Sequence, residues 1–323
     1  MSNSIASRLL ATAGLVLAFA AGAAAQDYPA RAVRVIVGFP AGGANDLIGR
    51  MVATKLSERL GKQFVVDNRA GAGGIVGTDL AAAAQPDGYT LLVVSIAHTA
   101  NPSLYKLKYD TEKAFTPIAQ LGAGASVLAV HPDVPAKSVR ELLDHVRANP
   151  GKLNMAHSGI GTFQHMSSSM LLSMAKLDMV LVPFKGGGPA TIDVVGGHTQ
   201  LAIFSVVQVT GHIKSGRLRA LGIGSTRRID SHPDLPTIAE AGVPGYDADN
   251  WWGVVGPAGM PQAVVGKLIA EITAVQDTRE LQETLDREGA RVVKRTGGDF
   301  GQMISDEITK WAKVVKDGKI QLE

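Results

Sequence analysis

Hydrophobic positions along the chain form short β-branched runs that alternate with segments of helical periodicity. The runs 33–37, 64–66 and 89–94 predict buried strands, and apolar residues at helical spacing predict helices over 47–60 and 78–84. Strands that alternate with helices in this way favour a parallel sheet with helices on both faces.

A second series of the same kind begins near residue 126. In chain order it predicts a strand at 127–130, a helix at 139–148, a strand at 153–156, a helix at 162–175, a strand at 180–182, a helix that begins near Pro189, a strand at 201–204, a helix at 205–215 and a strand at 218–223. A proline-rich connector at 231–250 and a strand at 251–255 follow, and then helices at 261–275, 279–288 and 298–316. The two series predict two α/β lobes, each with a mostly parallel sheet, and the length of 323 residues agrees with two domains.

The first 25 residues have the pattern of a secretory signal peptide. Arg8 precedes an apolar run over 9–21, and Ala23-Ala24-Ala25 forms an A-x-A cleavage site. The run has about 13 apolar residues, fewer than the roughly 20 that span a bilayer. We therefore expect cleavage after Ala25, export to the periplasm and no membrane anchor.

Composition narrows the functional classes. The chain has 32 Lys and Arg against 29 Asp and Glu, a formal charge of +3 that does not predict nucleic-acid binding. It has no cysteine, which excludes disulfides, thiolate metal sites and a lipid-modified N-terminal Cys. Glycine accounts for 37 of the 323 residues, about 11% against a usual share of about 7%. This excess indicates many tight turns with exposed backbone N–H groups.

Three segments approach catalytic or nucleotide-binding motifs and fail at the residue that performs the chemistry. Residues 156–160 lack both glycines of a nucleophile elbow, and residues 38–43 have P-loop glycine spacing but Ala44 in place of the lysine. Residues 71–76 would need glycine at Val76 to bind a dinucleotide. No histidine spacing suits a metal, so we expect neither a metal nor another cofactor.

The glycine-rich loops have a different chemistry in common. Gly42-Gly43, residues 158–162 and residues 186–188 each lie between the end of a strand and the start of a helix. Free N–H groups and the helix dipole favour an anion there, and open α/β sheets bind ligands at that edge. If two such lobes face each other, a ligand with two anionic ends, such as a dicarboxylate, fits between them.

Several side chains near these loops keep two interpretations. Asp46 either caps its helix or accepts a hydrogen bond from an ammonium or hydroxyl group of the ligand. Phe39 is either an apolar pocket wall or plain core. His98, expected in a loop after Ser95, is either a ligand contact or an ordinary loop histidine, and His165 is either in the cleft or on the surface.

Ordered motifs across the whole mature chain resemble one family. They are Phe39-Pro40-Ala41-Gly42-Gly43-x-x-Asp46, Asn68-Arg69-x-Gly71-Ala72, Pro86-Asp87-Gly88-Tyr89-Thr90-Leu91, Ser158-Gly159-x-Gly161-Thr162-x-x-His165 and Pro233-x-Leu235-Pro236-Thr237. With these motifs the chain resembles the Bug, or tripartite tricarboxylate transporter (TctC-like), extracytoplasmic solute-binding receptors.

The resemblance implies a two-lobed, flytrap-like periplasmic binding fold with two crossing strands as the hinge. The lobes would be residues 26–122 plus 251–323 and residues 123–250. The family's binding positions would fall on Phe39, Gly42, Gly43, Asp46, Ser95, His98, Ser158, Gly159, Thr162, His165, Gly186 and Ser205. Ala41 replaces a proline that is frequent in the family, and Ser205 replaces an aspartate that would suit a ligand amine.

The resulting hypothesis is a monomeric periplasmic protein, with no enzymatic activity, that captures a small organic carboxylate. The acid would be a di- or tricarboxylate or an aromatic acid, delivered to the permease subunits of a tripartite tricarboxylate transporter. Two alternatives remain at this point. One is a ligand-sensing module for a receptor kinase, and the other is a secreted hydrolase that uses Ser158, His165 and a carboxylate.

Overall fold

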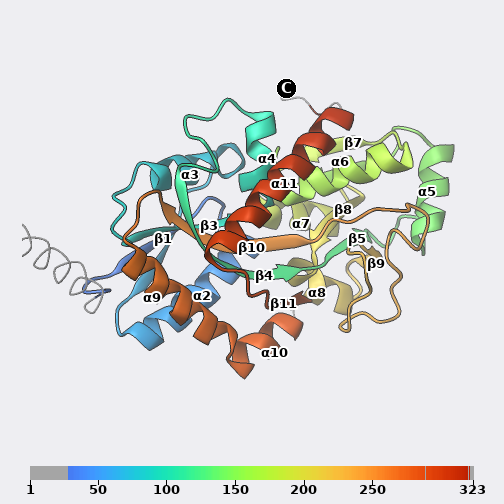
Figure 1. Ribbon diagram of the computed structural model, residues 1–323. Coiled ribbons are helices and arrows are strands. Elements are labelled where there is room, and N and C mark those ends of the chain that lie inside the picture. Colours follow the sequence, from blue (N-terminus) through green and yellow to red (C-terminus); the bar gives the residue numbers. More distant parts are fainter. Residues whose placement is uncertain (1–27, 288, 319, 321–323) are drawn as a thin grey trace, which may run out of the picture.

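The computed structural model describes residues 28–287, 289–318 and 320, which form two sheets with helices on both sides of each (Figure 1). The predicted signal peptide, residues 1–25, lies outside the described residues. None of the described helices is both long enough and apolar enough to cross a membrane.

The first sheet has six strands in the order β11-β4-β10-β3-β1-β2. They are β1 (Val33–Val37), β2 (Phe64–Asn68), β3 (Thr90–Ser95), β4 (Phe115–Gly124), β10 (Asn250–Pro257) and β11 (Ala290–Arg291). β1 pairs in parallel with β2 and β3, whereas β10 runs antiparallel to both β3 and β4. The sheet is therefore mixed, because the strand that returns late in the chain enters it from the opposite end.

The helices of this half pack on both faces of the sheet. They are α2 (Ala44–Leu60), a 3-10 turn η1 (Ala72–Gly74), α3 (Ile75–Ala82), α4 (Ile96–Leu104), α9 (Gln262–Gln276), α10 (Arg279–Arg287) and α11 (Gly297–Asp317). Val35 of β1 belongs to the core under α2 and α9, and its neighbour Ile36 belongs to the core under α4 and α11. This alternation shows that both sheet faces are buried, which explains the continuous hydrophobic runs in the sequence.

The second sheet has five strands in the order β7-β6-β8-β5-β9. They are β5 (Ser126–Val130), β6 (Asn154–His157), β7 (Val180–Pro183), β8 (Leu201–Ser205) and β9 (Arg219–Ile223), accompanied by α5 (Val139–Ala148), α6 (Phe163–Ala175), α7 (Gly187–Val195) and α8 (Val206–Lys214). β6 is parallel to β7 and β8, and β5 is antiparallel to β8 and β9.

The chain crosses between the two sheets on adjacent strands. β4 ends at Gly124 and β5 begins at Ser126, while the return path enters the first sheet at Asn250, which pairs with Gly124. The C-terminal helix α11 packs against α4 and β4 of the first half and also against α6 of the second (Figure 1). The expected two-lobed α/β architecture with a two-strand crossing is confirmed. Both sheets are mixed rather than mostly parallel, because β4 and β10 in the first sheet and β5 in the second pair antiparallel with their neighbours.

Three local predictions need correction. The segment after Ser95 is not a loop but the helix α4, whose residues are almost all buried although Pro102 lies inside it. The strand β4 was not expected, because Pro117 and its glycines hide any strand pattern. The helix predicted over 78–84 begins earlier, at Ile75, where Gly74 in a left-handed conformation ends the preceding turn.

Candidate ligand-binding site

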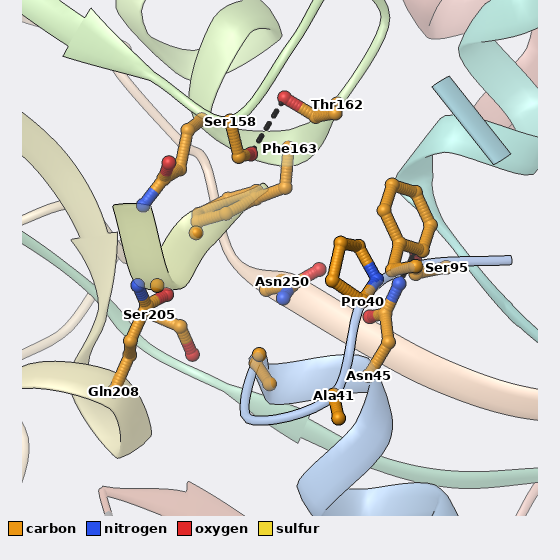
Figure 2. Close-up of a pocket in the computed structure, with 16 residues that line it drawn as sticks. Pro40, Ala41, Asn45, Ser95, Ser158, Thr162, Phe163, Ser205, Gln208 and Asn250 are labelled. Atoms are coloured by element: carbon orange, nitrogen blue, oxygen red, sulfur yellow. Dashed lines mark hydrogen bonds between the residues drawn. The ribbon is translucent and has the colours of Figure 1, made fainter. Parts of the chain in front are cut away.

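A pocket lies between the two lobes, at the carboxyl ends of strands from both sheets. Its lining residues are Phe39, Pro40, Ala41, Gly43, Ala44, Asn45, Ser95, Ser158, Thr162, Phe163, Gln164, Gly187, Gly188, Ser205, Gln208 and Asn250. In Figure 2, Ala41 and Asn45 lie on one side, Ser158 and Thr162 on the other, and Phe163 and Asn250 between them. Segments far apart in the sequence thus meet at one site.

Five helices direct their N-termini at this pocket: α2, α4, α6, α7 and α8, with N-cap residues Gly43, Ser95, Thr162, Gly186 and Ser205. Of these five helices, as far as the structure describes them, only α6 has a side-chain cap, in which Thr162 Oγ1 accepts the His165 N–H. The first turns of the other four helices have no side chain capping them. Their backbone donors and positive dipole ends therefore favour an anionic ligand group.

Among the described residues that line the pocket, none carries a charged side chain. The attraction for an anion thus comes from backbone N–H groups, helix dipoles and neutral side-chain donors rather than from a charged lining residue. A ligand ammonium group would find no carboxylate to compensate its charge, and burying an uncompensated charge is costly. The pocket therefore suits anions without an amine.

Two lining residues have buried polar atoms with no hydrogen-bond partner in the part of the chain that the structure describes. They are the Ser205 hydroxyl and both amide atoms of Gln164, and each residue is 2% exposed. Other hydroxyls in the pocket are engaged: Ser158 Oγ donates to Thr162 Oγ1 at 2.9 Å, the bond drawn in Figure 2. Buried polar groups without partners are rare, so these atoms indicate where a ligand binds.

The lobes are close together around this pocket. Tyr105, directly after α4, donates its Oη hydrogen to the Ile160 carbonyl of the second lobe at 3.4 Å, and Gly73 faces that same carbonyl. The cavity between them has a volume of about 50 Å³, room for a few water molecules. Phe39, Pro40 and Phe163 supply apolar walls. The two lobes thus leave only a narrow cleft between them.

Comparison with known proteins identifies the family. Residues 48–320 match the model of the tripartite tricarboxylate transporter family receptor, TctC. The chain belongs to this family. It is 35% identical to the protein BugT of Bordetella pertussis over 326 residues, which cover 98% of this chain and 99% of BugT. It is 37% identical over 295 residues to a UPF0065 protein of Pseudomonas sp. strain P51, covering 91% of this chain and 88% of that protein.

Solved structures of family members have the same fold. The R. palustris protein Rpa4515 with adipate has a TM-score of 0.87 at 31% identity, covering 91% of this chain and 99% of that one. MatC of Rhodopseudomonas palustris with bound malate has a TM-score of 0.85 at 33% identity, covering 89% and 100%. The periplasmic binding protein BugD has a TM-score of 0.87 at 32% identity, covering 92% and 100%.

The structure of this TctC-family receptor brings half of the expected binding residues together. Phe39, Gly43, Ser95, Ser158, Thr162 and Ser205 all line the pocket. Gly42, Asp46, His98, Gly159, His165 and Gly186 do not line it. Gly42, Gly159 and Gly186 lie within one residue of a lining residue or of a helix start, whereas the three ionisable residues are held elsewhere.

Asp46 is buried and occupied by the protein itself. Its carboxylate accepts hydrogen bonds from the Gly42 N–H at 3.0 Å, from Asn68 Nδ2 at 2.9 Å and from Arg50 Nε at 2.9 Å. Burial opposes ionisation, but the bonds from Arg50, Gly42 and Asn68 outweigh it and lower the pKa of Asp46. Asn68 also donates to the Phe39 carbonyl at 2.9 Å, so this cluster holds the loop that precedes α2.

The histidines support loops behind the pocket. His157 Nδ1 accepts the Gly159 N–H and His165 Nδ1 accepts the Gly161 N–H, each at 3.3 Å, and the two rings are 4.6 Å apart. Burial lowers the pKa of His157 to about 4 and that of His165 to about 3, so both rings are neutral acceptors. His165 is not on the surface, because it is 6% exposed.

His98 lies inside α4, where its ring packs edge-on against Phe115 of the first lobe. It lines a separate small cavity, away from the pocket between the lobes. Burial lowers its pKa to about 4.

Ser158 and His165 do not form the pair that the hydrolase hypothesis requires. Ser158 Oγ donates to Thr162 Oγ1, and His165 Nδ1 accepts the Gly161 backbone N–H. Within the described residues, no group of three His, Cys, Asp or Glu side chains is placed to hold a metal.

The sequence did not predict Phe163 or four polar lining residues, Asn45, Gln164, Gln208 and Asn250. The four polar residues are neutral amides, which belong to no catalytic motif. Asn45 adjoins Asp46, and Gln164 lies inside the motif that runs from Ser158 to His165, so proximity to a glycine loop was the only available signal.

Proposed function

We propose that this chain is a periplasmic receptor that captures a small organic carboxylate, a di- or tricarboxylate or an aromatic acid, between its two lobes. The observation that carries the proposal is the convergence of five helix N-termini on a pocket lined without charged side chains. The family members solved with adipate and with malate bind carboxylates, which supports the same ligand class here.

The mechanism is lobe closure without covalent chemistry. In an open form the N–H groups of the first helical turns are hydrated, and a carboxylate replaces that water as the lobes close. Each charge-assisted hydrogen bond then contributes about 1.5–3 kcal/mol. The lobes would be residues 26–122 plus 251–323 and residues 123–250, a division supported by the crossing at Gly124–Ser126 and Asn250.

Export and delivery complete the proposal. The signal-peptide pattern of residues 1–25 supports a periplasmic location. The closed, loaded form would be the one recognised by the permease subunits of a tripartite tricarboxylate transporter, because a partner must distinguish loaded from empty receptor. The family description names this transporter class.

A ligand screen by thermal shift and calorimetry tests the proposal. The panel contains dicarboxylates, tricarboxylates, aromatic acids, amino acids and the neutral diamide of each dicarboxylate as a matched control. An acid at 100 times its Kd should stabilise the protein by about 2.7 kcal/mol, and its diamide should not. A panel in which no carboxylate binds would overturn the proposal.

A further inference from the structure

Gln164 is the second residue of α6 and contributes an amide to the pocket. Its side chain is 2% exposed, and neither Oε1 nor Nε2 has a partner among the described residues. Ser205, at the start of α8, adds a buried hydroxyl that is also without a partner there. The two residues thus offer a ligand an amide NH2 donor group, an amide oxygen acceptor and a hydroxyl that can donate or accept.

An ionised carboxylate cannot satisfy this set. It has acceptor oxygens only, so it can pair with Gln164 Nε2 and with the Ser205 hydroxyl but not with Gln164 Oε1. Turning the amide over does not help, because one of its two atoms is always an acceptor. A bound carboxylate alone would leave that acceptor buried and unpaired, and such atoms are rare in folded proteins.

A donor group on the ligand would pair with that acceptor directly. An ammonium group is excluded by charge, because no described lining residue carries a carboxylate to compensate it. A hydroxyl group is neutral, donates one hydrogen bond and accepts others, so it can face Gln164 in a pocket of this kind.

We propose that the ligand is a hydroxycarboxylate and that Gln164 recognises its hydroxyl group. The inference rests on the proposed function, since it assumes that the helix N-termini hold the carboxylate. In this proposal Gln164 contacts the ligand directly, and the helix N-termini bind its carboxylate. A site built to bond a hydroxyl rejects the analogue that lacks it, because the site's own polar atoms are then left unpaired.

Matched acid pairs test the inference by calorimetry: succinate against malate, and glutarate against 2-hydroxyglutarate. The intact mature chain should bind the hydroxylated member of at least one pair about tenfold more tightly or better, which corresponds to about 1.4 kcal/mol. Gln164→Met keeps the volume but removes both polar atoms, and it should bind the two members within about threefold of each other. Gln302→Met, an exposed change on α11, is the control and should keep the preference.

The outcomes separate the two proposals. If every acid of the pairs binds without preference for the hydroxyl, or if Gln164→Met weakens both members equally, the inference about Gln164 is wrong while carboxylate binding stands. If no carboxylate of the pairs or of the wider panel binds, the proposed function fails and this inference fails with it.

Discussion

Closure of the cleft depends on a place where the backbone of one lobe touches the backbone of the other. Gly73, in the turn before α3, has φ of +62° and faces the Ile160 carbonyl across the cleft. A Cβ at this position would lie 2.7 Å from that oxygen. We predict that Gly73→Ala weakens ligand binding by preventing full closure.

The magnitude follows from two separate costs. Alanine in a left-handed conformation costs about 1–2 kcal/mol, and this cost applies whether the cleft is open or closed. In the proposed mechanism the contact with Ile160 forms only on closure, and the alanine Cβ would lie about 0.7 Å inside the 3.4 Å of ordinary contact. Overpacking of this kind costs about 1–3 kcal/mol, which should lower ligand affinity by about 5- to 150-fold.

Gly61→Ala provides a matched control. Gly61 has nearly the same φ, +64°, at the end of α2, but a Cβ there would have nothing within 4 Å. Both variants should lose similar stability in urea denaturation, and only Gly73→Ala should lose affinity in calorimetry with the tightest-binding acid of the panel. Equal affinities for Gly73→Ala and the wild type would refute the reasoning, because the bound form would then not contain this contact.

Three further predictions follow from the groups in and around the pocket. Asp46→Asn should cost about 1.5–3 kcal/mol of stability at pH 7. Because the folded pKa of Asp46 is lowered from 3.8, the stability that its carboxylate contributes is complete above pH 3.8 and is lost as the pH falls through the folded value. Urea denaturation of wild type and variant at pH 7 and pH 3 measures this, and an equal loss of stability in the variant at both pH values would contradict it. The wild type should lose stability as the pH falls from 6.5 towards about 4, because His157 and His165 stay neutral when folded but take up protons when unfolded. His165→Asn should reduce this dependence of the melting temperature on pH, and an unchanged dependence would contradict the role of His165. Ser205→Asp should lower the affinity for the acid by about tenfold or more in calorimetry, because it buries a like charge beside the ligand, and an unchanged Kd would mean that residue 205 does not face the carboxylate.

The sequence predicted those elements whose ends carry strong local signals. The helix predicted over 139–148 has the observed bounds, because Ser138 caps it by accepting the Glu141 N–H and Asn149-Pro150-Gly151 ends it. β4 and α4 were missed because long-range packing forms them. β4 holds its place by pairing with β10, more than a hundred residues later in the chain, and α4 is held by burial under α11.

The same distinction explains the site. Glycine and hydroxyl residues that directly precede helices were found, since the strand–loop–helix order fixes where a backbone N–H points. Asp46 and His165 were predicted as binding residues because they are ionisable. In the structure each accepts a hydrogen bond from a backbone N–H, that of Gly42 and that of Gly161. No local pattern distinguishes such a supporting residue from one that contacts a ligand.

Separation of charge recognition from shape recognition would let proteins of this fold change ligand while keeping the fold. In the proposed function, backbone N–H groups at five helix starts hold the anion, and no substitution of a lining side chain would remove them. Differences between ligands must then be recognised by the neutral side chains that complete the wall, here Gln164, Ser205 and Gln208. Family members about one-third identical to this chain were solved with adipate and with malate, ligands that share two carboxylates and differ in length and in a hydroxyl. Substitutions at these three positions should therefore change which acid binds without abolishing the binding of acids.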